Sequence, residues 1–290
     1  MNGRPNAVPV AMVLGAVVSV QVGGAVAFEV VDELGPGGTV LLRTAFAALV
    51  LAALWRPQWR GHGRRAWRHL VLFGFVLGAM NLCFYVGLER VPLGIAVTLE
   101  FVGPLGVALA GSRRALDLVW VALAAGGIVL LSGGFDGSID TLGALMCLLA
   151  GAFWGVYILL SARVGRDFPG GSGLAMAMVL SAAMLTPVGI ADGGASLLDL
   201  APLAAGFAIA MLSSAIPYSL ELEALRSLRT GVFGVLMSLE PAVAALVGLV
   251  ALDQGLASAE VVAIAMVVVA SAGALRAAAA KTDRPGVIEH

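Results

Sequence analysis

The chain has 290 residues, of which 60% are hydrophobic and 12% are charged, and its mean hydropathy is +0.99. Water-soluble globular proteins carry about 25% charged residues, so this composition excludes that class. The net charge of −1 and the pI near 6.3 provide no overall basic field, and nucleic-acid binding is therefore not expected. The composition predicts an integral membrane protein.

Ten apolar segments are long enough to cross a bilayer core of ~30 Å. We expect them to be helical, because lipid offers no partner to backbone polar groups outside a helix or a closed barrel, and alternating ten-residue strands are absent. The predicted fold class is therefore an all-α integral membrane protein with ten transmembrane helices. In chain order these helices cover residues 8–28, 37–54, 70–88, 92–110, 116–133, 141–160, 172–190, 202–220, 231–250 and 258–275.

The first segment follows Arg4 and contains the A-x-A pattern Ala25-Val26-Ala27, which is typical of cleaved signal peptides. We prefer a spanning helix, because the run is longer than a signal-peptide core and includes polar residues. Cys83 and Cys147 both lie inside apolar runs, where we expect each to behave as a small hydrophobic residue.

The distribution of Lys and Arg predicts that both termini are cytoplasmic. With the N-terminus inside, the inner segments carry 15 of the 17 basic residues, the outer loops carry only Arg90, and Arg43 lies within the second helix. The inner set is Arg4, Arg56, Arg60, Arg64, Arg65, Arg68, Arg113, Arg114, Arg163, Arg166, Arg226, Arg229, Arg276, Lys281 and Arg284, whereas the outer loops hold Asp32, Glu33, Asp136, Asp140, Asp192 and Asp253.

The arginine-rich segment 56–69, RPQWRGHGRRAWRH, has two interpretations. It is either a site for lipid headgroups or regulation, or a loop that sets topology and is anchored by tryptophans. We prefer the second.

An internal repeat appears when GIAVTLE, residues 94–100, is aligned with GVLMSLE, residues 234–240, at an offset of 140 residues. Gly, Leu and Glu coincide, and Thr98 aligns with Ser238. Five helices per half is an odd number, so the second half must enter the membrane upside down. This is the inverted-repeat plan of secondary transporters, whose sites lie near the midplane between the halves. The halves are predicted at 1–140 and 141–280, followed by a cytoplasmic tail at 281–290.

Arg43, Glu100 and Glu240 are the ionisable side chains expected deep in the membrane. Such residues normally face the bundle interior or a watery cavity. At ~1.5 Å per residue, Gln21, Arg43, Asn81 and Glu100 should share one level, roughly 9 to 12 Å below the outer face. Two alternatives remain open. The first is an Arg43–Glu100 pair that only fixes helix packing, with Gln21 and Asn81 as interhelical hydrogen-bond partners; the second is a polar belt that lines a cavity for a zwitterionic or cationic solute.

Three prolines bear on this choice, because each removes the hydrogen bond to the carbonyl four residues earlier. Pro104 should free the carbonyl of Glu100, Pro241 that of Met237, and Pro217 that of Ser213, with Ser214 and Tyr218 nearby. We expect loosened turns and freed carbonyls beside the two glutamates, where they suit an ammonium group.

Further side chains allow two interpretations. Phe84, Tyr85, Trp154 and Tyr157 either wall a cavity or pack ordinarily. The motifs at 74–78 and 151–155, Gly-x-x-x-Gly, predict close helix contact. Motifs for hydrolases, zinc proteases, nucleotide binding and redox-active cysteine pairs are absent, so no enzyme, metal site or cofactor is expected.

The stretches VPLGIAVTLEFVGPLGVAL, SRRALDLVWVALAAGGIVLL and PYSLELEALRSLRTGVFGVLMSLEPAVAALVGLVAL closely resemble the EamA-type branch of the drug/metabolite transporter superfamily. Within that branch the closest resemblance is to the bacterial threonine/homoserine exporter group, and it extends over residues 10–280. The resemblance implies a carrier of ten helices in the bacterial cytoplasmic (inner) membrane, surrounded by lipids. It also implies two inverted repeats and export of small metabolites such as amino acids, driven by protons. It says nothing about oligomeric state.

The resemblance also implies a set of substrate-binding residues by matching motif: Gln21, Arg43, Asn81, Tyr85, Glu100, Trp154, Tyr218 and Glu240. Two positions depart from the family pattern. Gln254 stands where Glu is common, and Leu228-Arg229-Thr230 replaces a common L-P-T. Both lie at membrane boundaries, so they affect the expected loops more than the carrier assignment.

The expected function is secondary-active export of small amino acids or related metabolites by alternating access. The alternative is efflux of organic cations or drugs, with Glu100 and Glu240 as counter-charges. Arg43 separates the two, because an amino acid brings a carboxylate to it, whereas a simple cation is repelled.

Overall fold

The computed structural model describes residues 7–110, 115–131, 139–225, 227–228 and 230–282. The elements within these ranges are helices, and seven are long and apolar enough to cross a membrane, with two shorter apolar stretches at Leu93–Val107 and Leu118–Leu130. The elements are α1 (Ala7–Trp55), α2 (Arg64–Leu88), α3 (Leu93–Glu100), α4 (Val102–Ala110), α5 (Ala115–Leu131), α6 (Thr141–Asp167), α7 (Ser172–Gly193), η1 (Gly194–Leu198), α8 (Leu200–Ala210), η2 (Met211–Ala215), α9 (Ile216–Leu225), α10 (Thr230–Met237), α11 (Glu240–Ala251) and α12 (Ser258–Thr282).

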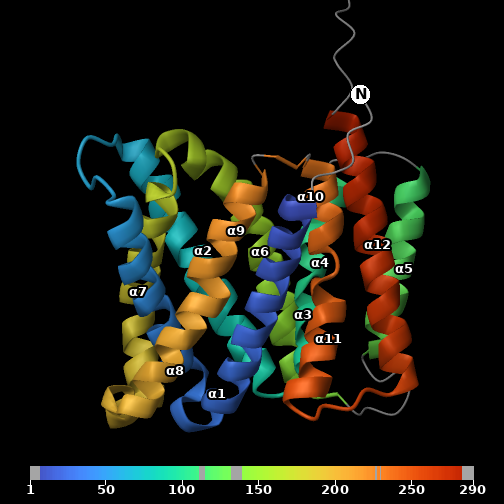
Figure 1. Cartoon of the computed structure of the whole chain (residues 1–290), viewed down its shortest axis with the longest axis horizontal. Coiled ribbons are helices and arrows are strands. Elements are labelled where there is room, and N and C mark those ends of the chain that lie inside the picture. Colours follow the sequence, from blue (N-terminus) through green and yellow to red (C-terminus); the bar gives the residue numbers. More distant parts are fainter. Residues whose placement is uncertain (1–6, 111–114, 132–138, 226, 229, 283–290) are drawn as a thin grey trace, which may run out of the picture.

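The first two predicted helices, 8–28 and 37–54, are joined without a separate loop, so the expected connection between them was wrong. α1 is helical on both sides of a kink at Gly35, whose φ of 67° and ψ of 166° are not helical. Glycine tolerates this positive φ because it has no Cβ. The backbone N–H of Gly37 donates to Oδ2 of Asp192 at 2.9 Å, which ties the kink to α7. Figure 1 shows α1 running to the kink at the bottom and returning.

Two other predicted helices are broken, as the prolines indicated. The segment 92–110 divides at Phe101 into α3 and α4, and 231–250 divides at residues 238–239 into α10 and α11. Pro104 and Pro241 follow these breaks, and neither can donate a backbone hydrogen bond. The breaks lie in the aligned repeat segments, directly after Glu100 and directly before Glu240.

The segment 202–220 is helical throughout, but it contains a π-helical turn, η2, just before Pro217. A π-turn of this kind re-spaces the backbone where the proline removes a normal i to i−4 bond. The N–H of Ile216 accordingly reaches back to the carbonyl of Met211. The irregularity exposes carbonyl groups that neighbouring helices then satisfy.

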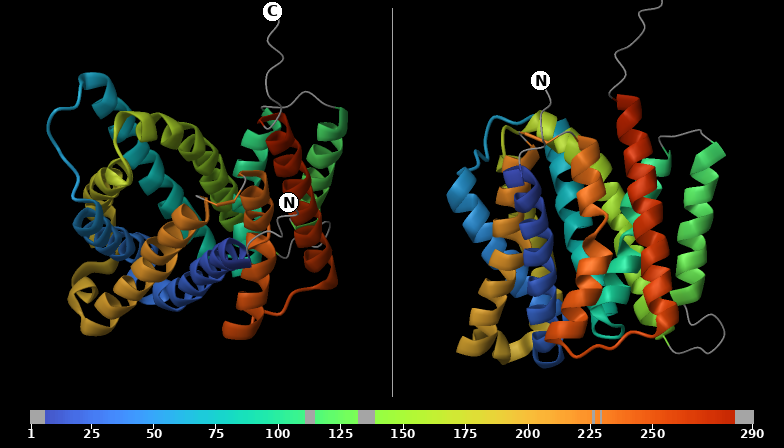
Figure 2. Two further views of the ribbon diagram at one scale, coloured as in Figure 1. Left: turned by 45° about the horizontal axis from the view of Figure 1, so that its top comes forward. Right: turned by 45° about the vertical axis from the view of Figure 1, so that its right-hand side comes forward.

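Glycines let the helices approach closely. Gly74 and Gly78 of α2 lie against Ala177 and Ser181 of α7, as the Gly-x-x-x-Gly motif predicted. Gly94 of α3 lies against Ala245 of α11, so the two broken helices contact each other. In Figures 1 and 2, α5 and α12 lie side by side at one edge of the bundle.

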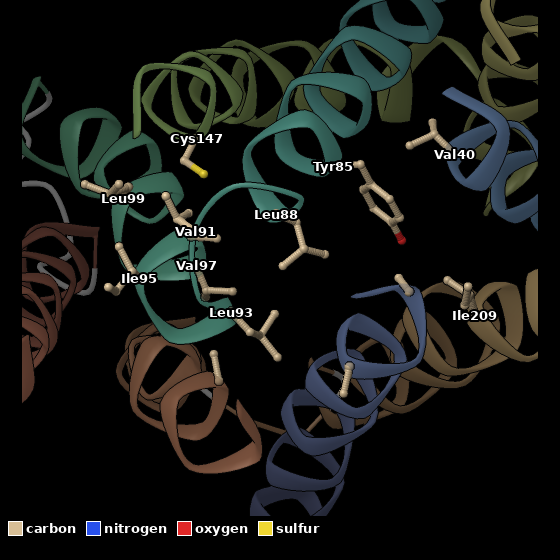
Figure 3. Close-up of a cluster of buried hydrophobic side chains, with 14 of the residues drawn as sticks. Val40, Tyr85, Leu88, Val91, Leu93, Ile95, Val97, Leu99, Cys147 and Ile209 are labelled. Atoms are coloured by element: carbon tan, nitrogen blue, oxygen red, sulfur yellow. The ribbon is translucent and has the colours of Figure 1, made fainter. Parts of the chain in front are cut away.

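A buried apolar cluster surrounds the turn from α2 to α3 (Figure 3). Leu88, Leu93 and Ile95 are completely buried in it. Cys147 is also buried there, against Gly87, and both cysteines of the chain are free. The expectation that each cysteine acts as a small hydrophobic residue is confirmed for Cys147.

α1 begins and α12 ends at the same end of the bundle (Figure 1). At this end His69 Nδ1 lies 2.8 Å from Asp167 Oδ2, which joins α2 to α6. At the opposite end Arg90 and Asp140 approach to 4.0 Å. The first end carries Arg56, Arg60, Arg64, Arg65, Arg68, Arg163, Arg166 and Arg276. Arg4, Arg113, Arg114, Asp136, Arg226, Arg229, Arg284 and tail residues 283–290 lie outside the described residues.

Candidate functional site

A cavity of about 410 Å³ lies among the helices. Residues before and after each helix break line it, from α3 and α4 and from α10 and α11. It is lined from α1, α2, α3, α4, α6, α9, α10, α11 and α12, and from η2. Residues that the sequence placed at similar depths therefore meet in one space. All eight residues of the predicted binding set line it: Gln21, Arg43, Asn81, Tyr85, Glu100, Trp154, Tyr218 and Glu240.

Arg43 is held in place by neutral groups. Its Nη1 donates to Oδ1 of Asn81, and its Nη2 donates to the backbone carbonyl of Ser213 at 3.4 Å. The guanidinium carbon lies 5.7 Å from the centre of the Tyr85 ring, within the range of a cation–π contact. Figure 3 shows Tyr85 extending from α2 toward α1. These contacts orient the guanidinium and leave its charge uncompensated.

Asn81 is itself oriented by the backbone. Its Nδ2 donates to the carbonyl of Leu77 at 2.7 Å, so its Oδ1 faces Arg43. Only the oxygen can accept from a guanidinium, and the Leu77 bond fixes which way the amide points.

Glu100 does not pair with Arg43. Both residues are described, and no nitrogen–oxygen contact of 4.0 Å or less joins them, although Arg43 is close enough to act electrostatically on Glu100. The alternative of a buried Arg43–Glu100 packing pair is therefore wrong in its direct form. The cavity holds a cation and a carboxylate that do not neutralise each other by contact.

Three polar side chains of the cavity have no protein partner. Gln21 and Glu240 are 2% and 5% exposed, and Glu100 is partly buried. Among the described residues, no hydrogen bond or ion pair reaches the side chain of any of the three. Buried polar groups normally have hydrogen-bond partners, so these three are available to a solute or water.

The backbone carbonyls freed by proline differ in the contacts that they make. Those of Leu212 and Ser213, before Pro217, accept from Ser19 Oγ at 2.7 Å and from Arg43. The carbonyl of Glu100 instead lies directly against Gly151 of α6, where a Cβ would come within 2.5 Å of it. The expectation that this carbonyl would help to bind an ammonium group was therefore wrong. The Glu100 carboxylate is left as the group beside the cavity.

Aromatic rings form much of the cavity wall. Phe84, Tyr85, Trp154 and Tyr157 all line it, as the cavity-wall interpretation predicted, and two of them also pack on neighbouring rings. Trp154 meets Phe101 edge to face at 5.5 Å, so it packs on the residue at the break between α3 and α4. Tyr157 stacks on Phe73 at 4.9 Å. These contacts limit the ring orientations and give the cavity a defined shape.

Sequence reasoning missed Glu221 as a lining residue. It lies at the edge of the predicted helix 202–220 and was excluded by that boundary. The available signal was spacing, since Pro217, Tyr218 and Glu221 fall at i, i+1 and i+4 on one helix face. Ser214, by contrast, is buried without a hydrogen-bond partner and does not line the cavity.

The cavity brings together one fixed guanidinium, several carboxylates and neutral amide and hydroxyl groups. Such a set can hold a carboxylate at Arg43 and an ammonium group at Glu100 or Glu240. Within the part of the chain that the structure describes, no cluster of three or more His, Cys, Asp or Glu residues is arranged to hold a metal ion. The chemistry available is binding of a small polar or zwitterionic molecule.

Comparison with known proteins gives consistent relatives. The chain is 41% identical over 272 residues to the threonine/homoserine exporter RhtA of Salmonella typhimurium (strain SL1344), covering 93% of this chain and 92% of that protein. It is 40% identical over 276 residues to the same exporter of Escherichia coli (strain K12), covering 94% and 93%. These relatives are transporters.

A solved crystal structure also matches, with a TM-score of 0.63 and 20% identity over 92% of this chain and 96% of that chain. At this identity the likeness extends to the fold alone. The model of the EamA-like transporter family matches twice, at residues 8–133 and 141–276. The two matches and the RhtA relatives together show that this chain belongs to the EamA-like transporter family, whose members are multi-pass membrane proteins that move small molecules.

Proposed function

We propose that this protein is a secondary-active exporter of small amino acids, of the threonine and homoserine type, in the bacterial inner membrane. The observation that carries the proposal is the separation of Arg43 from Glu100 within one cavity. A zwitterionic amino acid brings a carboxylate and an ammonium group, so it can satisfy both charges at once. The relatives' function as threonine/homoserine exporters supports this choice of solute.

Side-chain polarity in the cavity also favours small hydroxylated amino acids. Gln21 is buried without a partner, and an amide can both donate to and accept from a hydroxyl group. The remaining wall is mainly aromatic and aliphatic, and it leaves about 410 Å³. A solute of this kind offers a carboxylate to Arg43, an ammonium group to one glutamate and a hydroxyl group to Gln21.

We place the chain across the membrane ten times, with both termini in the cytoplasm. α1 then supplies two crossings on either side of Gly35, and each broken pair, α3 with α4 and α10 with α11, supplies one. The two family matches support a division into inverted halves at 1–140 and 141–280. Export proceeds by alternating access, as the halves expose the shared cavity to each side in turn.

Coupling to protons is assigned to Glu100. A carboxylate without a protein partner in this cavity can exchange a proton for the ammonium group of the solute. Glu100 takes a proton from outside and releases it inside as the next solute binds, so downhill proton entry drives export. Glu240, which aligns with Glu100 in the internal repeat, also has no protein partner, and we assign it to the gate in the second half of the chain.

The test is transport in proteoliposomes loaded with labelled threonine, homoserine, other amino acids or organic cations, with and without an imposed proton gradient. We expect counterflow of small hydroxylated amino acids and uphill movement only when a proton gradient is present. Counterflow without any response to the gradient would reject the coupling and keep the solute assignment. Absence of amino-acid counterflow from folded protein would reject the solute.

A second candidate is efflux of organic cations. It is favoured by the excess of acidic residues in the cavity, where Glu100, Glu221 and Glu240 accompany a single described arginine. Transport of tetraalkylammonium ions that survives Arg43→Ala would select this candidate.

A further inference from the structure

A second hollow lies on the outside of the bundle, remote from the cavity described above. It is a groove of about 570 Å³ along α2, and it shares no lining residue with the cavity. From α2 it is lined by Arg64, Trp67, Arg68, Val71, Leu72 and Phe75. These positions follow the spacing i, i+3, i+4, i+7, i+8 and i+11, so they form one stripe on the helix. Met184 of α7 forms part of the opposite wall.

The stripe changes character along its length. Arg64, Trp67 and Arg68 lie in the first turns of α2, at the arginine-rich end of the bundle. Val71, Leu72 and Phe75 follow toward the middle of the membrane and are 42%, 48% and 52% exposed. One end of the groove therefore offers cations and an indole, and the rest offers only apolar surface. This order matches the headgroup and acyl chain of a phospholipid.

The arginines of the groove are not neutralised by the protein. Both are exposed, and among the described residues neither makes an ion pair or a side-chain hydrogen bond. One acidic residue, Asp167, is near this end of α2, but it already has a partner, because its Oδ2 lies 2.8 Å from Nδ1 of His69. An anion that enters the groove would meet two free guanidinium groups without an opposing carboxylate.

Indole rings mark the level at which a headgroup would lie. Trp67 lies 6.3 Å from Trp59 between ring centres, and Trp59 is 41% exposed. Tryptophan collects at the membrane–water interface, where one side is apolar and the other is wet. The arginines on the same turns of α2 therefore stand at phosphate depth. The apolar part of the groove then lies at the depth of the acyl chains.

We propose that this groove is a binding site for one anionic phospholipid. Its phosphate lies between Arg64 and Arg68, Trp67 lies at the level of the glycerol, and one acyl chain follows Val71, Leu72 and Phe75 to Met184. The site depends on the membrane location of the bundle and does not depend on the transported solute. It supports the lipid-headgroup interpretation of the 56–69 segment for this part of α2.

Occupancy has a mechanical consequence, because the groove is formed by α2 and α7. The lipid touches both helices, at Phe75 of α2 and Met184 of α7, beside the close contacts that Gly74 and Gly78 make with Ala177 and Ser181. α2 also carries Asn81 and Tyr85 of the cavity. A bound lipid therefore holds one wall of the carrier against its neighbour.

The experiment is native mass spectrometry of the purified full chain with added phosphatidylglycerol or phosphatidylcholine. We expect one phosphatidylglycerol adduct that resists collisional removal, and at least tenfold weaker retention, about 1.4 kcal/mol, in Arg64→Gln/Arg68→Gln. The matched control is Arg163→Gln/Arg166→Gln, which removes two exposed arginines from the same end of the bundle but outside the groove. This control should retain the lipid as the unmodified chain does.

Two further measurements distinguish binding of the acyl chain from binding of the phosphate alone. Leu72→Trp fills the apolar part without changing charge, and it should also weaken the adduct. Glycerol phosphate in excess should not displace the lipid, because it lacks the acyl chain. Equal retention of phosphatidylcholine, equal losses in the two double variants, or displacement by glycerol phosphate would each overturn the proposal. Monodisperse elution of every variant verifies folding before the comparison.

Discussion

Asn81 holds the guanidinium of Arg43 through a neutral amide, on a helix that is itself part of the cavity wall. The arrangement fixes the direction of a positive charge while leaving that charge free. An aspartate in the same position would make an ion pair of nearly identical shape. A substitution at position 81 can therefore neutralise the charge of Arg43 without changing its orientation.

We predict that Asn81→Asp weakens amino-acid export at least tenfold with little change in folded protein, because the new carboxylate competes with the solute for Arg43. Initial rates in proteoliposomes, measured at several solute concentrations, check this. Arg43→Ala should abolish export, because the carboxylate of the solute then has no positive partner in the cavity. Export at the normal rate by Asn81→Asp would show that the charge of Arg43 is not used.

Glu100→Gln should keep solute binding within about tenfold, roughly 1.4 kcal/mol, because the amide retains the size and a hydrogen-bonding oxygen. It should lose accumulation driven by a proton gradient, since the amide cannot carry the proton. Counterflow and gradient-driven uptake in the same vesicles distinguish the two effects. Normal accumulation by this variant would remove Glu100 from the coupling step.

Gly103→Ala should lower stability by about 1–3 kcal/mol, the usual range for overpacking. The added methyl group would lie directly against the backbone of Gly151, which cannot yield without moving α6. Gly106→Ala, in the same helix, is the control, because nothing lies within 4 Å of its Cβ position. It should be neutral or stabilising by up to about 1 kcal/mol. Thermal unfolding in detergent, followed by circular dichroism, compares them, and equal melting points would contradict the packing.

Cysteine labelling tests the orientation in the membrane. In a background with Cys83 and Cys147 replaced by alanine, Asp199→Cys should react with an impermeant maleimide added outside, and Arg60→Cys should not. Both positions are exposed and lie at opposite ends of the bundle. Asp136, another candidate for the outer label, lies outside the described residues. The reverse pattern of labelling would invert the assigned topology.

Much of this arrangement follows from the sequence because the membrane restricts the choices. Long apolar runs have to be helical, so the first residues of α6, α7 and α12 were predicted correctly, although these helices end 7, 3 and 7 residues later than expected. Pro104 and Pro241 likewise predicted irregular turns beside Glu100 and Glu240. Counting residues along a helix of constant rise predicted that Arg43 and Glu100 share one level, and both line the same cavity.

The direction in which groups point was not predictable. Counting residues places Glu100 and Arg43 at one level, but the angle around each helix axis depends on contacts with distant segments. The Arg43 partner is Asn81 because Leu77 turns that amide, and the Glu100 carbonyl faces Gly151 because α6 approaches it closely. The continuous path of α1 through Gly35 was also not predictable, because the kink is stabilised by a contact with Asp192, which is 155 residues from Gly37 in the sequence.

The kink at Gly35 also bears on how the chain enters the membrane. The helical segments on either side of it have almost no connecting chain, so neither can settle at its final depth while the other stays in water. With the topology proposed above, they insert together as a hairpin. The part that has to cross is the turn, where Glu29, Asp32 and Glu33 are exposed. In that topology, insertion of this hairpin transfers three carboxylates to the far side of the bilayer.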